Sequence, residues 1–312
     1  MTATIHPGSV FTDDRGEVAQ LHGCAPVRVG DRWYAWGENK SRGALFTAVD
    51  CYSSADLAEW RYEGASLAAQ VHPDLTEDRI IERPKVLQRP DGTWVMFLHV
   101  ESHDYSYARV GYAVADNPVG PYEYVGSERP LGNISRDIGV YQEDGVGYLL
   151  SEDRDNGLHI YRLRDDYLAV EEIVATLRQV PRPEIGYESP ALVKHEGLYY
   201  LFGSDLTGWS TNDNKVATAA SLAGPWSDWE DFAPAGSATF DSQVSAVVPV
   251  EDDLFVYVGD RWQQDELYTS PAVWLPMRLN GGAVQMDWAD AWSLGEVRAG
   301  AGAGASAGAP AR

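Results

Sequence analysis

Residues 83–97 read RPKVLQRPDGTWVMF, and this stretch decides the fold because it describes a β-hairpin. A short strand, residues 83–87, runs into the acidic-glycine pair Asp91-Gly92, and an aromatic strand, residues 94–97, follows it. Acidic-glycine pairs between two strand-like runs are typical of tight hairpin turns. The stretch therefore predicts two antiparallel strands joined by a short turn.

The same pattern returns along the chain, at residues 25–37, 137–150, 189–202 and 244–257. Most of the units continue into a third strand, as at residues 110–115 and 215–220. Units two and four close with the similar phrases NPVGPY, residues 117–122, and SLAGPW, residues 221–226. Long repeats made only of strands predict an all-β, five-bladed β-propeller with three or four strands per blade. A solenoid fits less well, because the short β-helix period is missing.

Composition narrows the choice of partners. The chain has 47 acidic and 24 basic residues, a net charge of −23. The negative electrostatic field of such a charge repels phosphate backbones and anionic membranes, so we expect neither as a partner. A neutral carbohydrate is permitted. The 11 Trp and 17 Tyr suit core packing in a β protein or the stacking of sugars. Cys24 and Cys51 form no metal-ligand spacing and no disulfide framework.

The organisation predicted is one propeller domain over residues 1–297 and a disordered tail over residues 298–312. The tail is nearly all Ala and Gly, with no apolar period. Residues 1–10 show no secretory signal and no run is long enough to span a bilayer, so the expected location is cytoplasmic. The sequence does not indicate the oligomeric state.

The chemistry is expected where the first strands of the blades begin. In a propeller these strands surround the central axis, so their starting residues converge at one face. The five starts are His22-Gly23-Cys24, Glu82-Arg83, Arg136-Asp137, Glu188-Ser189 and Ser242-Gln243. Three of them supply a carboxylate at nearly the same register.

Two interpretations of these carboxylates remain open. Arg83 and Arg136 can pair with them in a structural ion-pair network, since unpaired buried charge is costly. Alternatively they perform glycoside hydrolysis, in which one carboxylic acid protonates the departing oxygen while water attacks the opposite face. A second acid nearby raises the pKa of the proton donor. Glu188, Asp137 and Glu82 are the candidates for these roles.

At these residues the sequence resembles glycoside hydrolase family 43, and within it the exo-β-1,3-galactanases (galactan 1,3-β-galactosidases). The matching phrases run along nearly the whole folded chain. They include residues 36–40 (WGENK), 82–86 (ERPKV), 135–137 (SRD), 188–192 (ESPAL), 207–209 (TGW), 239–243 (TFDSQ) and 259–262 (GDRW). The resemblance implies a five-bladed propeller that hydrolyses with inversion and releases galactose from β-1,3-linked galacto-oligosaccharides or galactan.

The resemblance also implies roles for single residues. Glu188 matches the general acid, and Asp137 matches the aspartate that tunes the acid's pKa and orients the sugar. Gln243 matches a glutamine that holds the attacking water, and Glu82 matches a further important glutamate. The residues expected to line the terminal-sugar pocket are Glu38, Tyr107, Thr207, Trp209 and Trp262.

Departures from the family pattern keep alternatives open. Most of family 43 has an aspartate as base on the first blade, whereas His22-Gly23-Cys24 has no carboxylate. That absence is shared by the galactanases and argues against an α-L-arabinofuranosidase or β-xylosidase. It also suits a non-catalytic sugar-binding propeller, although the retention of Glu188 with Asp137 favours the enzyme. The lack of a signal suggests short oligosaccharides taken into the cell.

No cofactor is expected to be required. Some members of the family hold calcium in the central channel, but no cluster in this sequence demands a metal.

Overall fold

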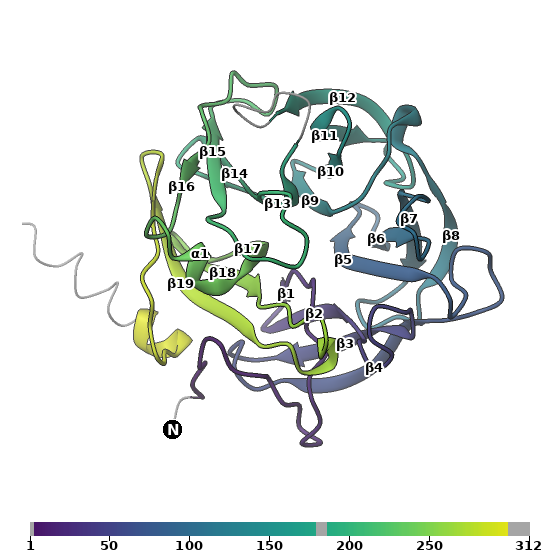
Figure 1. Ribbon diagram of the computed structural model, residues 1–312, viewed down its shortest axis with the longest axis horizontal. Coiled ribbons are helices and arrows are strands. Elements are labelled where there is room, and N and C mark those ends of the chain that lie inside the picture. Colours follow the sequence, from purple (N-terminus) through teal and green to yellow (C-terminus); the bar gives the residue numbers. More distant parts are fainter. Residues whose placement is uncertain (1–2, 179–185, 299–312) are drawn as a thin grey trace, which may run out of the picture.

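The computed structural model describes residues 3–178 and 186–298 as a ring of five four-stranded antiparallel sheets. The predicted all-β, five-bladed β-propeller is confirmed (Figure 1). Each blade is a meander in which consecutive strands pair, and the predicted first hairpins form its two inner strands. The predicted disordered tail falls outside the described residues from residue 299 onward.

The strands follow the chain in blade order. Blade one contains β1 (Val27–Val29), β2 (Arg32–Glu38), β3 (Ala48–Ser54) and β4 (Arg61–Ala68), and blade two contains β5 (Ile80–Gln88), β6 (Trp94–Glu101), β7 (Arg109–Ala115) and β8 (Glu123–Glu128). Blade three contains β9 (Ile138–Glu143), β10 (Val146–Asp153), β11 (Gly157–Leu163) and β12 (Val170–Leu177). Blade four contains β13 (Glu188–His195), β14 (Leu198–Ser204), β15 (Lys215–Ala219) and β16 (Glu230–Asp231), and blade five contains β17 (Gln243–Glu251), β18 (Leu254–Asp260), β19 (Ala272–Asn280) and β20 (Ala283–Gln285). Short helical turns are η1 (Pro130–Gly132), α1 (Ala238–Asp241) and η2 (Leu267–Thr269).

The first strand of each blade lies next to the central axis, as Figure 1 shows for β1, β5, β9, β13 and β17. Strand β13 lies against both β9 and β17, and β5 lies against β9. Apolar side chains pack between neighbouring sheets in five clusters. Most of the large aromatics belong to these clusters, including Trp36, Trp60 and Trp274. Core packing therefore explains most of the aromatic content.

The ring is closed by the N-terminal segment, which the repeat did not predict. Ile5 exchanges backbone hydrogen bonds with Trp292, and the Gly8 N–H donates to Ala272 O at 2.7 Å in blade five. The Asp14 N–H donates to Trp60 O at 2.9 Å in blade one. Residues 5–14 thus tie the last blade to the first.

We expect Ile5→Ala to lower the free energy of unfolding by about 2–4 kcal/mol, because Ile5 is buried in the cluster between blades five and one. Urea unfolding followed by tryptophan fluorescence measures this loss. The control is Val71→Ala, since Val71 is fully exposed and its truncation leaves no cavity. Equal midpoints for the two variants would show that the segment does not hold the ring closed.

Two other features of the described residues bear on the sequence analysis. Cys24 and Cys51 are both buried and unpaired with each other, so no disulfide joins them. Within the part of the chain that the structure describes, no helix has the length and apolar character required to cross a membrane.

Candidate active site

The residues that open the first strands meet at one end of the central channel. We call His22, Glu82, Asp137, Glu188 and Gln243 the opening ring. Four of its members line a cavity of about 240 Å³, which His22 does not line. His22 is buried and lies behind Trp262, with ring centroids 5.7 Å apart. The sequence prediction that distant blade starts gather around one hollow therefore matches the geometry.

β-Bulges direct two of the ring carboxylates. The pairing register shifts between Glu82 and Lys85 in β5, and between Glu188 and Ala191 in β13. Arg83 and Ser189, which precede prolines, have φ values of 53° and 54°. A proline cannot donate to the ladder, and a bulge both accommodates it and re-aims the neighbouring side chain. The repeated phrases with Pro84 and Pro190 thus produce the local distortion on which the site is built.

A second ring of polar residues lies behind the first, on the second strand of each blade. Its members are opposite the opening-ring residues in the hairpin register, and all are buried: Glu38, His99, Glu152, Ser204 and Asp260. Glu82 pairs with His99 in this register, and Gln243 pairs with Asp260. The channel end therefore carries two polar layers instead of one.

Arg83 is the cation that joins the two layers. Its guanidinium lies 3.2 Å from Asp137 Oδ2 and 3.4 Å from Asp260 Oδ2, and it donates to Gln243 Oε1. Burial raises the pKa of Asp260 to about 6, partly offset by the charge of Arg83. Of the two arginines predicted to pair with the carboxylates, Arg83 does so, whereas Arg136 Nη2 donates to Tyr105 O at 2.6 Å. The Arg83 network lines an open cavity and coexists with the functional arrangement.

Glu188 has the environment of a proton donor. It is 8% exposed, and burial raises the pKa of its carboxyl well above the usual value. The nearby carboxyl groups of Asp137 and Glu152 raise it further, while Arg83 and Arg154 act in the opposite direction. A carboxylic acid that keeps its proton near neutral pH is able to protonate a departing glycosidic oxygen.

Gln243 contacts the acid directly. Its Nε2 donates to Glu188 Oε1 at 2.9 Å and to Ser204 Oγ at 2.8 Å. Its Oε1 accepts from Arg83 and from Trp262 Nε1, the latter at 3.0 Å. The amide is therefore fixed in one orientation, with its oxygen toward donors and its nitrogen toward the acid.

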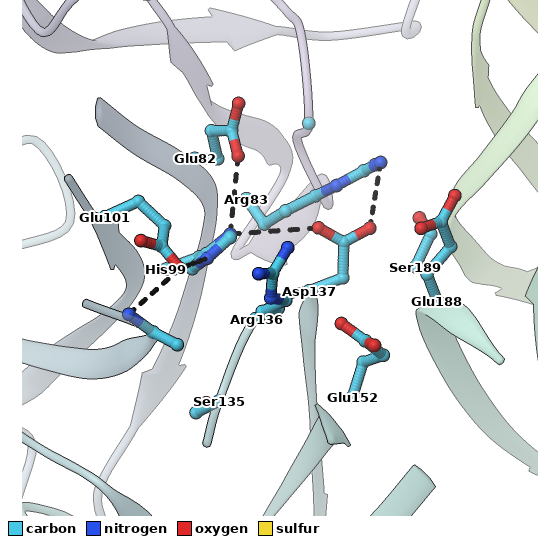
Figure 2. A network of polar contacts seen from close by, with 12 residues as sticks. Glu82, Arg83, His99, Glu101, Ser135, Arg136, Asp137, Glu152, Glu188 and Ser189 are labelled. Carbon is cyan, nitrogen blue, oxygen red and sulfur yellow. Dashed lines mark hydrogen bonds and ion pairs between the residues drawn. The ribbon is translucent and has the colours of Figure 1, made fainter. Parts of the chain in front are cut away.

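Glu82 and His99 form the opposite side of the site, as Figure 2 shows. His99 Nδ1 lies 3.4 Å from Glu82 Oε2 and 3.8 Å from Asp137 Oδ1, and Nε2 lies 3.4 Å from Glu101 Oε1. Burial opposes its charge, but the contacts with the Glu101 and Glu82 carboxylates prevail and raise the pKa of His99 to about 9. Although burial acts against it, the contact with His99 and the charge of Lys40 lower the pKa of Glu82 to about 2. Glu82 is thus an ionised carboxylate.

These contacts do not suit a calcium ion. Glu82, His99 and Asp137 bring ligand atoms within 4.8 Å of one another. The two carboxylates already face cations, however, because Arg83 lies 3.2 Å from Asp137 and Lys40 lies 3.9 Å from Glu82. The cationic groups already occupy the places where a metal would be attracted, so we assign no metal to this cluster.

The predicted sugar-pocket residues are placed unevenly. Glu38, Trp209 and Trp262 line the cavity, and the two indole rings meet edge to face with centroids 5.9 Å apart. Thr207 is exposed and lies beside the lining residues Gly208 and Trp209 without lining the cavity itself. Tyr107 lies away from it, with its hydroxyl donating to Asp74 Oδ1 at 2.6 Å.

Tyr105 stands where Tyr107 was expected. It lines the cavity, and its hydroxyl donates to Glu82 Oε1 at 3.1 Å. Tyr105 has a φ of 54°, and this turn selects which of the two tyrosines faces inward. Spacing in the sequence does not reveal such a turn, which is why the prediction for Tyr107 was wrong.

The sequence reasoning also missed Glu152 and Arg154, which line the cavity. The sequence does predict the position of Glu152. Pairing the residues of the two strands outward from the Asp144-Gly145 turn places Glu152 opposite Asp137, and its N–H donates to Asp137 O at 2.9 Å. Arg154 follows the end of β10, in a turn whose direction the sequence does not specify.

A carboxyl group with a raised pKa beside further carboxyl groups, in an open cavity at the end of a five-bladed propeller, is the arrangement that a glycoside hydrolase requires. Residues 25–256 match the model of glycosyl hydrolases family 43, and the chain belongs to this family. No curated protein matches the chain.

Solved structures of exo-β-1,3-galactanases are closely similar. A candidate exo-β-1,3-galactanase from Bifidobacterium bifidum is 49% identical with a TM-score of 0.89, and the match covers 91% of this chain and 97% of that one. An exo-β-1,3-galactanase variant from Phanerochaete chrysosporium, bound to β-1,3-galactotriose, is 37% identical with a TM-score of 0.89, over 94% and 68% of the two chains. The Clostridium thermocellum exo-β-1,3-galactanase is 32% identical with a TM-score of 0.85, over 92% and 66%.

Proposed function

We propose that this glycoside hydrolase releases galactose, with inversion, from the end of β-1,3-linked galacto-oligosaccharides or galactan. The observation that carries the proposal is the buried, proton-retaining carboxyl of Glu188 beside Asp137 at the cavity. The three exo-β-1,3-galactanases similar over most of this chain support the choice of sugar and linkage.

In the proposed reaction, Glu188 gives its proton to the glycosidic oxygen as the bond from that oxygen to C1 breaks. A water molecule attacks C1 from the opposite face, which inverts the anomeric configuration. Gln243 positions this water through its amide. Glu82, as an ionised carboxylate, receives the proton that the water loses, directly or through a second water.

The contact between Gln243 and the acid bears on how substrate fits. The acid and base carboxyl groups of inverting glycosidases are about 6.5–9.5 Å apart, because the sugar and the water lie between them. Here the Gln243 amide nitrogen is 2.9 Å from Glu188 Oε1. Because the proposed reaction places a water at Gln243 and the glycosidic oxygen at Glu188, we expect substrate binding to open this contact.

The direct test is to incubate the protein with β-1,3-galactobiose and follow the products by proton NMR. We expect free galactose, with the α anomer appearing first. An initial β anomer would contradict inversion, and the absence of galactose would contradict the substrate. A panel of aryl glycosides that includes α-L-arabinofuranoside and β-xyloside tests the rival specificities. Binding of galactobiose without cleavage of any member would instead identify a sugar-binding propeller.

A further inference from the structure

Glu152 is a buried carboxyl group in the second ring that the proposed reaction does not use. Its side chain is fully buried, yet it contributes to the cavity lining. Its Oε2 has no hydrogen-bond partner among the described residues. Figure 2 shows the Glu152 carboxyl next to Asp137, with Glu188 across from both, and its charge acts on each of them. An unsatisfied buried oxygen is costly, so its place at this site calls for a function.

Arg154 connects Glu152 to the acid. Its Nε lies 3.3 Å from Glu152 Oε1, and its Nη2 lies 3.5 Å from Glu188 Oε2. The Arg154 side chain is 43% exposed at the cavity, whereas both carboxyl groups that it contacts are buried. The single guanidinium is thus shared between two acids on neighbouring blades.

We propose that Glu152 is a positioning residue for the acid Glu188, because it competes for Arg154 and adds a second carboxyl group, beside Asp137, to the space that Glu188 faces. Both effects oppose loss of the Glu188 proton before the substrate is cleaved. The inference rests on the proposed function, since it assigns Glu188 as the acid.

The charges around the two groups agree with this role. Glu152 faces Arg154 beyond the end of β10, Asp137 and Arg136 before β9, and Glu188 on β13. Burial is the main cause that raises the pKa of Glu152 to about 7. For Glu188, Asp137 and Glu152 add to the effect of burial, and Arg83 and Arg154 oppose it. Glu152 and Arg154 therefore act on Glu188 in opposite directions.

The test compares Glu152→Gln with Arg154→Gln through the pH dependence of kcat/KM on β-1,3-galactobiose. The alkaline limb of this profile reports loss of the proton from the acid. Glutamine at position 152 removes the competing carboxyl and leaves Arg154 to stabilise the Glu188 carboxylate. We expect the limb to move to lower pH by about one unit in that variant, and to higher pH by a similar amount in Arg154→Gln. A purely structural role does not produce opposite displacements.

Two further variants test whether the displacement depends on the charges at positions 152 and 154. Arg154→Lys keeps a cation but has one nitrogen in place of the fork that reaches both acids, so its limb is expected to move to higher pH by less than in Arg154→Gln. Glu143→Gln removes a carboxylate that pairs with Lys194 away from the cavity, and we expect no displacement. Should Glu152→Gln not fold, Glu152→Asp replaces it, because the shorter side chain withdraws from Arg154 and displaces the limb in the same direction by less.

A second measurement separates the inference from the proposed function. Carbon-13 NMR of labelled glutamate carboxyl groups follows the titration of Glu188 without any substrate. A lower pKa for Glu188 in Glu152→Gln than in wild type supports the inference even if galactobiose is not cleaved. An unchanged titration, or an unmoved limb in an active protein, overturns it and leaves the proposed function intact.

Discussion

Replacing Glu188 with glutamine is expected to lower turnover of β-1,3-galactobiose by about 10²–10⁴-fold, the usual contribution of a general acid. Glutamine has nearly the same shape and keeps a hydrogen-bonding partner for Gln243, but it has no proton to give to the departing oxygen. The variant should also lose the alkaline limb of the wild-type pH profile, because that limb belongs to the missing carboxyl. Steady-state kinetics across pH measures both effects.

Substrates with different leaving groups make this prediction sharper. The dinitrophenolate group of a dinitrophenyl galactoside leaves without being protonated. Glu188→Gln should therefore retain much more activity on that compound than on galactobiose. Glu143→Gln is the matched control, since it removes a carboxylate that lies outside the cavity. Equal losses on both substrates, or an active Glu188→Gln on galactobiose, would show that another group is the acid.

Replacing Arg83 with methionine is expected to destabilise the protein by about 3–5 kcal/mol and to abolish activity, because one partner of a buried charge network is removed. The Arg83 guanidinium is 6% exposed and contacts Asp137 and Asp260. Without it, these carboxyl groups stay buried without their counter-charge. Urea unfolding measures the loss, and activity falls because Arg83 also holds Gln243.

The loss of stability should depend on pH in a defined direction. The pKa of Asp260 is already raised to about 6 by burial, and removal of Arg83 raises it further. A group whose folded pKa lies above its unfolded value gives up stability as pH rises through the folded value. The variant is therefore expected to be closest to wild type in acid and weakest near neutral pH.

Two comparisons check the origin of this effect. Arg278→Met breaks an exposed ion pair with Asp253 and should cost less than about 1 kcal/mol. Adding Asp260→Asn to Arg83→Met removes one unpaired charge and should restore part of the stability. If Arg83→Met loses no more stability than Arg278→Met, the buried network contributes little to the fold.

Much of the fold follows from local patterns that any single blade contains. A hairpin needs only a tight turn between two alternating strands, and five copies that cannot each bury their apolar faces have to stack. Closure of the ring, by contrast, does not follow from such local patterns. Ile5 and Trp292 lie at opposite ends of the chain, and no repeat or turn motif indicates that they pair.

The candidate site likewise contains residues that the sequence identifies and residues that it does not. Glu82, Asp137, Glu188 and Gln243 could be identified because each opens a repeat, and the turn register places Glu152 opposite Asp137. By contrast, the preference for Tyr105 over Tyr107 depends on the backbone of one loop. The contact of Arg154 with Glu188 likewise depends on how two blades face each other.

The sequence by itself determined the repeated hairpins, their number, and the carboxylates at the start of the inner strands, since turn chemistry and strand alternation act over a few residues. Only the tertiary structure decided which loop residues face the cavity, how Arg83 and Arg154 are shared, and which acid keeps its proton. Those properties depend on burial and on distances between charges on different blades, and both arise only when the ring closes.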